Sequence, residues 1–175
     1  YLPNSGQWLG TGTGKTLVAS VTSLYKKIKY GVPTVIIMPP LLIEQWDRWL
    51  AEFKPKLKVV AYHGTPAHRK SLSFEGADFV LVGPQIFKKE YDKFMTFFLP
   101  VHPNVVVDEA TMVCNIGTGT HEAIYDFAIG CNQELLTGTP ANNPMDAYGL
   151  LKFTNPGAYR NLKHFENMHV EGRDF

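Results

Sequence analysis

Residues 9–16 read LGTGTGKT and place Gly10, Gly12 and Gly14 at alternate positions, directly before an apolar run with helical spacing. Alternating glycines are unfavourable inside a helix or a strand, because glycine loses more backbone freedom on ordering than any other residue. They favour a tight loop whose successive N–H groups point inward. Together with the positive end of the following helix, such a loop forms an anion site suited to polyphosphate. The pattern departs from the general phosphate-loop form at Leu9, where glycine is usual.

Each residue of this predicted phosphate loop has an expected role. We expect the backbone of Gly12, Thr13 and Gly14 to surround the phosphates. Lys15 would reach the β- and γ-phosphates, and the Thr16 hydroxyl would bind Mg²⁺. An ordinary glycine-rich turn is the alternative interpretation.

The composition is that of an ordinary globular protein. The 175 residues, 45% of them hydrophobic and 19% charged, are enough for one domain with its own core. The formal net charge of +1 gives no overall basic field, so any contact with nucleic acid must come from local patches or backbone amides. Cys114 and Cys131 lie far apart without CxxC spacing, which argues against a disulfide scaffold and a zinc site.

The sequence carries no sign of targeting to a membrane. No basic segment followed by an apolar run opens the chain, and the longest apolar stretches are too short to cross a bilayer. We therefore expect an intracellular protein, cytoplasmic or nuclear, without a membrane partner.

Short β-rich runs alternate with amphipathic helices, which predicts an α/β fold with a mostly parallel sheet and helices on both faces. The expected strands are residues 34–38, 57–62, 78–82, 104–110 and 134–136, preceded by a thin first strand at 7–9 with residues 1–6 as a loop. The expected helices are residues 15–29, 42–53, 67–72, 87–98, 120–129 and 144–153.

Two of these helices carry clear apolar stripes. The first places Leu17, Val21, Leu24, Tyr25 and Ile28 on one face. The second places Leu42, Trp46, Trp49, Leu50 and Phe53 on one face. For both tryptophans the spacing favours core packing.

Two carboxylates, Asp108 and Glu109, follow three valines at the end of a predicted buried strand. Ligands of open α/β sheets bind at the carboxyl ends of the strands, which places Asp108 beside the phosphate loop. Asp108 would hold Mg²⁺ directly or through water, and Glu109 would polarise the water that attacks the γ-phosphate. A solvated pair at a strand end is the alternative.

A third candidate site follows the last predicted strand. Thr137, Gly138 and Thr139 lie at the same edge of the sheet as the carboxylates. Thr137 or Thr139 would sense the nucleotide and transmit a shift onward. On spacing alone, this stretch is a turn.

In this order, Thr-Gly-x-Gly-Lys-Thr, Asp-Glu-Ala-Thr and Leu-Thr-Gly-Thr-Pro resemble motifs I, II and III of superfamily 2 helicase-like ATPases. The Leu-Thr-Gly-Thr-Pro form is similar to the Swi/Snf-type DNA translocases, whereas DEAD-box RNA helicases have Ser-Ala-Thr there. Residues 38–46 and 62–64 resemble other segments of the Swi/Snf type. Residues 83–85 depart from the usual form of motif Ib, and Thr111 stands where histidine is commoner.

The resemblance implies that residues 1–175 form the first RecA-like lobe of a two-lobed motor, with the second lobe absent from the sequence. Mg-ATP would lie between the lobes, and duplex DNA would cross both. An arginine finger from the second lobe is worth roughly 10³–10⁵-fold in rate, so the lobe alone would hydrolyse ATP slowly or not at all. Gln7 is too close to the loop to serve as the family's adenine-reading glutamine.

The resemblance also implies where DNA would contact this lobe. The expected contacts are Pro39, Pro40, Gly83, Gln85 and Asn142, mostly through backbone groups to phosphates, which suits binding without sequence preference. A solvated surface pair is the expected state of Arg69 and Lys70. A strand-separating RNA or DNA helicase lobe, a non-catalytic nucleotide- or DNA-binding half-motor and a small-molecule kinase remain as alternatives.

Overall fold

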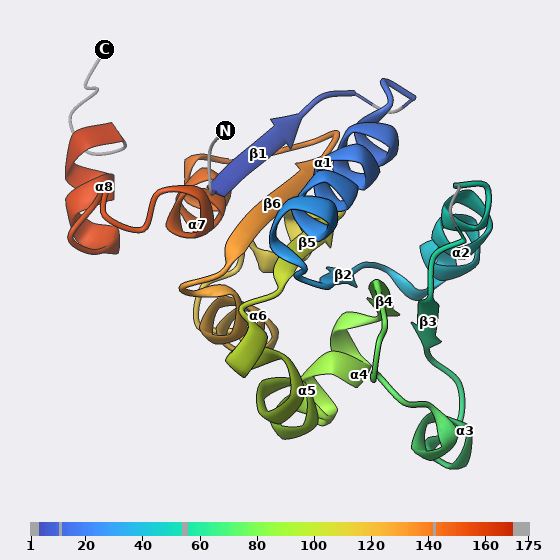
Figure 1. The fold of residues 1–175 in the computed structure, drawn as a ribbon. Coiled ribbons are helices and arrows are strands. Elements are labelled where there is room, and N and C mark those ends of the chain that lie inside the picture. Colours follow the sequence, from blue (N-terminus) through green and yellow to red (C-terminus); the bar gives the residue numbers. More distant parts are fainter. Residues whose placement is uncertain (1–3, 11, 54–55, 142, 170–175) are drawn as a thin grey trace.

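The structure is a computed structural model that describes residues 4–10, 12–53, 56–141 and 143–169. Within this part of the chain, one six-stranded sheet has the order β1-β6-β5-β2-β4-β3, and every neighbouring pair is parallel (Figure 1). The strands are β1 (Asn4–Trp8), β2 (Thr34–Ile37), β3 (Val59–Tyr62), β4 (Phe79–Val82), β5 (Asn104–Asp108) and β6 (Asn132–Thr137). The predicted α/β class and the parallel sheet are confirmed.

Helices cover both faces of this sheet. They are α1 (Lys15–Tyr30), α2 (Ile43–Ala51), α3 (Pro66–Ser71), α4 (Pro84–Lys89), α5 (Tyr91–Phe98), α6 (Gly119–Ala128), α7 (Pro144–Thr154) and α8 (Leu162–His169). Short 3₁₀ helices are η1 (Pro40–Leu42), η2 (Leu99–Val101) and η3 (Ala110–Val113). None of the helices in the described ranges is long and apolar enough to cross a membrane.

Several element boundaries differ from those predicted; β5, for example, ends at Asp108 rather than at residue 110. β1 begins at Asn4 rather than at residue 7, because its whole length pairs with β6, from Asn4 opposite Gln133 to Trp8 opposite Thr137. The helix predicted at residues 87–98 is two helices, α4 and α5, that meet at Glu90, whose φ of −113° and ψ of 27° are not helical.

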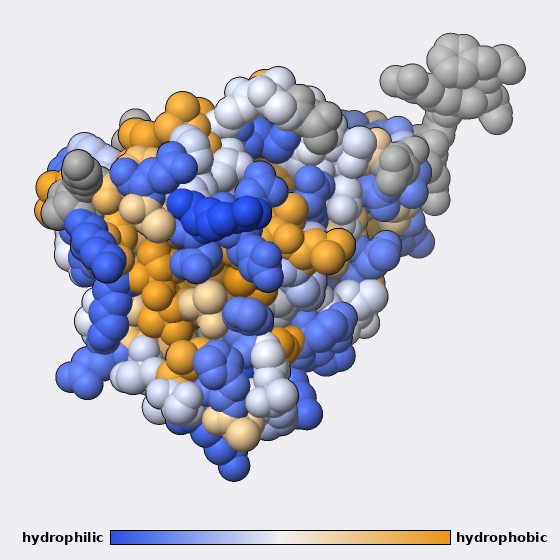
Figure 2. All heavy atoms as spheres, turned by 90° about the vertical axis from the view of Figure 1, so that its right-hand side faces the viewer, coloured by the Kyte–Doolittle hydropathy of each residue, from blue (hydrophilic) through white to orange (hydrophobic). Residues whose placement is uncertain are grey.

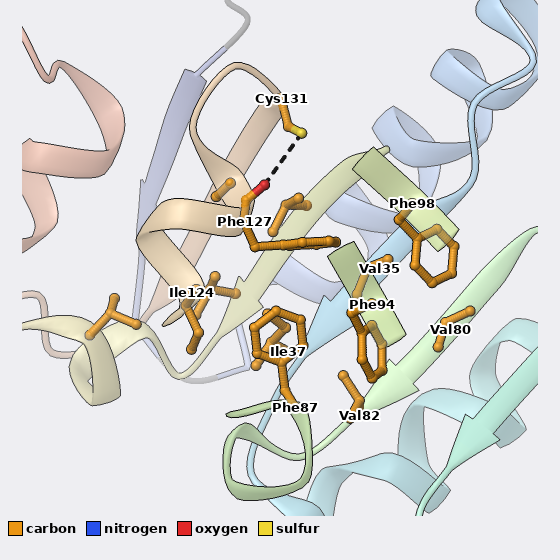
Figure 3. Close-up of a cluster of buried hydrophobic side chains, with 14 of the residues drawn as sticks. Val35, Ile37, Val80, Val82, Phe87, Phe94, Phe98, Ile124, Phe127 and Cys131 are labelled. Carbon is orange, nitrogen blue, oxygen red and sulfur yellow. Dashed lines mark hydrogen bonds between the residues drawn. The ribbon is translucent and has the colours of Figure 1, made fainter. Parts of the chain in front are cut away.

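The buried central strands β2, β4 and β5 send alternate side chains into two cores. The larger core, under α4–α7, contains close aromatic pairs (Figure 3). Phe87 lies 4.9 Å from Phe94 and 5.1 Å from Phe127 between ring centroids. The smaller core lies under α1 and α2, and apolar side chains reach the surface on the side that carries α2 and β3 (Figure 2).

Four of the five residues in the apolar stripe of α1 face solvent, in contrast to the usual rule for a helix packed on a sheet, and the fifth, Leu24, packs against the smaller core. Leu17, Val21, Tyr25 and Ile28 are 47%, 50%, 48% and 86% exposed. The buried residues of α1 are Ala19, Ser20, Ser23 and Lys26. Three of these four are small, so the helix axis can lie close to the sheet.

Polar side chains of the sheet explain the orientation of α1. Lys26 Nζ donates to Asn104 Oδ1, and Asn104 Nδ2 donates to Ser23 Oγ over 3.0 Å. Glu134, buried in β6, accepts hydrogen bonds from Thr22 Oγ1 at 2.8 Å and from Gln7 Nε2. Burial lowers the pKa of Lys26, and the nearby Glu134 carboxylate partly opposes this shift.

Arg69 is buried rather than solvated, which corrects the expectation from the sequence. Only 5% of it is exposed, and its Nε lies 2.7 Å from Glu90 Oε1 while Nη1 donates to the Gly64 carbonyl. Tyr62 Oη also donates to Glu90. Burial and this carboxylate raise the pKa of Tyr62 to about 12. The Arg69 charge therefore links α3 to the junction of α4 and α5 rather than serving as a free surface charge.

The two cysteines provide a test of the packing. Burial raises the pKa of both Cys114 and Cys131 to about 11. At pH 8 only about a thousandth of each thiol is then ionised, and only thiolates react quickly. We expect iodoacetamide to modify both thiols slowly in the native chain and rapidly in guanidinium chloride, as followed by intact mass. Rapid modification of the native chain would contradict this packing.

Candidate nucleotide-binding site

The phosphate loop connects β1 to α1 and has left-handed backbone at two of its glycines. Gly12 has a φ of +75° and Gly14 a φ of +87°, a conformation that strains any side chain. Gly14 is the N-cap of α1 and makes no side-chain cap hydrogen bond, and the first turn of α1 contains no acidic residue. The N-terminal N–H groups of α1 are therefore available to an anion.

Lys15 and Thr13 close the loop through hydrogen bonds to its own carbonyl groups. Lys15 Nζ donates to Leu9 O at 2.7 Å and to Gly10 O at 2.9 Å. Thr13 Oγ1 donates to Gly10 O at 2.7 Å. The Lys15 ammonium group therefore lies over the loop. A phosphate that binds there must replace these two carbonyl oxygens as the hydrogen-bond acceptors of Lys15.

Asp108 ends the fully buried strand β5 and is itself only 7% exposed. Its Oδ1 accepts the Glu109 backbone N–H at 2.9 Å, and its Oδ2 accepts the indole N–H of Trp46 at 2.8 Å. A buried carboxylate requires such partners, because its desolvation is costly. Glu109 has a φ of 52° and a ψ of 55°, an uncommon backbone conformation for a residue other than glycine.

One cavity of about 710 Å³ brings the phosphate loop and the carboxylates together. Six of the predicted site residues line it: Gly12, Gly14, Lys15, Thr16, Asp108 and Glu109. Thr13 belongs to the same loop. Helix α2 and its C-cap residue Glu52 form another wall, which sequence reasoning did not assign to the site; the lining residues of the helix are Gln45, Trp46, Arg48 and Trp49. Trp46 does pack in the core, as predicted, but a buried indole N–H also needs an acceptor.

Thr137, Gly138 and Thr139 follow β6, which lies between β1 and β5. Thr137 is fully buried, and its Oγ1 accepts the Thr139 backbone N–H at 3.1 Å. Thr139 lines a separate cavity of about 130 Å³ that also includes Thr111. This turn therefore contacts the segment after the carboxylates rather than the nucleotide cavity itself.

Two of the turns predicted to contact DNA touch each other. A Cβ atom at Gly83 would lie 3.2 Å from Pro40 Cγ, so the absence of a side chain permits the close approach. Pro40 and Gln85 are exposed, Pro39 is half-buried and Gly83 is buried. Asn142 lies outside the described residues.

Gly149 connects the segments that follow the second and third motifs. A Cβ atom at this position of α7 would lie 2.2 Å from the Cys114 carbonyl oxygen, directly after η3. The backbones of α7 and of the segment after the carboxylates are therefore in direct contact. His121 of α6 adds a second link to η3, because its Nδ1 lies 2.6 Å from Val113 O.

Comparisons with a family model and with curated proteins agree on one protein family. The family model of the SNF2-related domain matches residues 10–172. The chain is 29% identical over 165 residues to the nuclear protein STH1/NPS1 of Saccharomyces cerevisiae, covering 89% of the chain and 12% of that protein. It is 28% identical over 168 residues to the chromatin-remodeling ATPase INO80 of Drosophila melanogaster, covering 88% and 10%. The chain thus spans only about a tenth of the length of these relatives.

A solved structure shares the fold. The Sulfolobus solfataricus SWI2/SNF2 ATPase core in complex with double-stranded DNA superimposes with a TM-score of 0.77 at 24% identity. The match covers 94% of this chain and 34% of that one.

The contact at Gly149 generates a stability prediction. Gly149→Ala forces a methyl group against the Cys114 backbone, and overpacking of this kind costs about 1–3 kcal/mol. We expect a lower urea midpoint with an unchanged m-value. Gly157→Ala is the matched control, because a Cβ atom there meets nothing within 4 Å. Equal midpoints for the two variants would argue against the tight contact.

Proposed function

The chain belongs to the family of SNF2-related domains, and on this basis we propose that it is the first RecA-like lobe of an ATPase that moves along or remodels duplex DNA. The observation that carries this proposal is the single cavity lined by the phosphate loop, Asp108 and Glu109.

The site fits a nucleoside triphosphate. Gly12 and Gly14 provide left-handed backbone, and the uncapped start of α1 provides N–H donors. Lys15 would exchange its two carbonyl partners for β- and γ-phosphate oxygens, a pairing between opposite charges. Thr13 belongs to the same loop through its bond to Gly10.

The oxygen donors of the site fit Mg²⁺. The Thr16 hydroxyl and the Asp108 carboxylate line the same cavity, and Mg²⁺ prefers one or two protein oxygens completed by phosphates and water. The described residues contain no group of three or more His, Cys, Asp or Glu side chains that could enclose a metal, which suits this shared coordination. When bound, Mg²⁺ would neutralise charge on the phosphates. Glu109, half-buried at the cavity wall, would orient the attacking water and accept its proton.

The proposed DNA contacts lie on turns at the carboxyl edge of the sheet. Pro40 and Gln85 are exposed there, and Gly83 keeps the two turns together. Backbone groups of such turns can contact phosphates without reading the base sequence. The complex of the S. solfataricus core with double-stranded DNA supports a duplex as partner. Asn142 is part of this proposal from its sequence position alone.

A second RecA-like lobe would complete the motor. The match covers 34% of the similar ATPase core, which supports the proposal that this chain is a single lobe. Within this lobe, the turn formed by Thr137, Gly138 and Thr139 would couple the nucleotide state to the rest of the motor. The buried Thr137 and the contact of α7 with the segment after η3 support a mechanical connection.

One prediction of the proposed function concerns nucleotide binding. Lys15→Ala removes the cation expected on the β- and γ-phosphates, so titration calorimetry with Mg-ATP should show at least a tenfold loss of affinity, about 1.4 kcal/mol or more. Lys70→Ala, an exposed lysine of α3, is the control and should bind as the parent chain does. If the parent chain and Lys15→Ala bind equally weakly, the chain is better described as a DNA-docking half-motor.

Another prediction of the proposed function concerns ATP hydrolysis. Without an arginine finger, which is worth roughly 10³–10⁵-fold, we expect little or no ATP turnover by the chain alone. Glu109→Gln should reduce any turnover further while leaving Mg-ATP affinity nearly unchanged, because it removes the proton acceptor and keeps the shape. The measurement is phosphate release under saturating Mg-ATP. Turnover of several per second without any partner would refute this prediction.

A further inference from the structure

The hydrogen bond between Trp46 and Asp108 assigns a role to a residue for which the sequence predicted only core packing. We infer that Trp46 is a positioning residue, which fixes the Asp108 carboxylate for Mg²⁺ without touching metal or nucleotide itself. This inference rests on the proposed function, because it requires Asp108 to be the metal ligand.

The geometry around Asp108 leaves little freedom to its carboxylate. Trp46 Nε1 donates to Oδ2 at 2.8 Å, and the Glu109 N–H donates to Oδ1 at 2.9 Å. One donor on each oxygen fixes the plane of the carboxylate. Each ionised oxygen accepts about two hydrogen bonds or metal bonds, so capacity for Mg²⁺ remains. Asp108 lines the cavity, and this remaining capacity is therefore available there.

Core packing alone does not account for Trp46. The side chain is 1% exposed and packs in the smaller core with residues such as Ile36, Met38 and Leu50. An apolar ring would fill the same space, but only an indole supplies an N–H donor at this position. Partners that orient a metal ligand typically contribute about 10–100-fold to metal affinity.

Trp49, one turn further along α2, is a natural comparison. Its Nε1 donates to Ser20 Oγ at 3.0 Å, and its ring meets Phe53 edge to face with centroids 5.7 Å apart. It lines the same cavity and bonds to α1 instead of to Asp108. Trp49→Phe therefore removes an indole hydrogen bond from the same helix and leaves the carboxylate held.

The decisive experiment measures how much Mg²⁺ improves nucleotide binding. Calorimetry with the non-hydrolysable analogue β,γ-imido-ATP is performed in excess Mg²⁺ and in EDTA, for the parent chain, Trp46→Phe and Trp49→Phe. In Trp46→Phe we expect the Mg²⁺-dependent gain in affinity to fall by about tenfold, with the affinity in EDTA unchanged. In Trp49→Phe the Mg²⁺-dependent gain should remain within about twofold of the parent, even where the altered cavity wall lowers both affinities, since Asp108 keeps its partners.

Each other outcome has a defined meaning. If Trp46→Phe keeps the full Mg²⁺-dependent gain, or loses affinity equally in EDTA, the inference is overturned and the proposed nucleotide site stands. If Trp49→Phe loses the gain as fully as Trp46→Phe, specific positioning by Trp46 is likewise overturned. If the parent chain shows no Mg²⁺-dependent gain, the proposed metal site itself fails, and the role of Trp46 fails with it.

A second measurement does not depend on the folding of Trp46→Phe. The chain has 3 tryptophans, so Trp8→Phe combined with Trp49→Phe leaves Trp46 as the sole indole emitter. Adding Mg²⁺ with β,γ-imido-ATP should change its emission, because a cation arrives beside the hydrogen-bonded carboxylate. Asp108→Asn in the same background should abolish this change. The inference is overturned if the Trp46 emission does not change when Mg²⁺ is added, or if it changes equally in Asp108→Asn.

Discussion

A carboxylate buried at the end of β5 is the constraint on which the rest of the site depends. Asp108 is 7% exposed, and a charge in that environment is tolerated only with well-placed donors. One donor is the next backbone N–H, which Glu109 directs through its left-handed conformation. The other belongs to Trp46, so α2 must pack with this indole inside. Because α2 follows η1 directly, the burial of one carboxylate also determines where the turn at Pro40 lies.

Helix α1, which buries small and polar residues and exposes much of its apolar face, begins at the same edge of the sheet. Its small buried residues allow close approach, and Glu134 and Asn104 of the sheet hold its polar face through Thr22, Ser23 and Lys26. Buried polar groups of this kind are directional, whereas apolar packing tolerates sliding. These contacts fix the position of α1 relative to β5 and β6. Because the helix is rigid, they also fix its start, which carries Lys15 and Thr16.

Much of this architecture follows from local sequence patterns. Apolar runs predict β2, β4 and β5, and glycine alternation predicts the left-handed loop, because both signals depend on neighbouring residues. The meeting of the loop with Asp108 follows from the general rule for parallel sheets. The bond from Trp46 to Asp108 spans 62 positions, and the polar face of α1 has its partners in β5 and β6. Periodicity cannot reveal such partners. The expectation of a solvated Arg69 was wrong for the same reason, because its partner Glu90 belongs to another part of the sequence.

The position of β1 at the edge of the sheet has a consequence for how the molecule assembles. β1 opens the described chain, yet within the described residues it pairs with β6 alone, with Asn4 opposite Gln133. Closing so long a loop is entropically costly, and such contacts form slowly. Among the described strands, the partner of β1 becomes available during synthesis only when β6 has left the ribosome. The phosphate loop, although it precedes β6 in the chain, is thus among the last of the described parts of the fold to gain support.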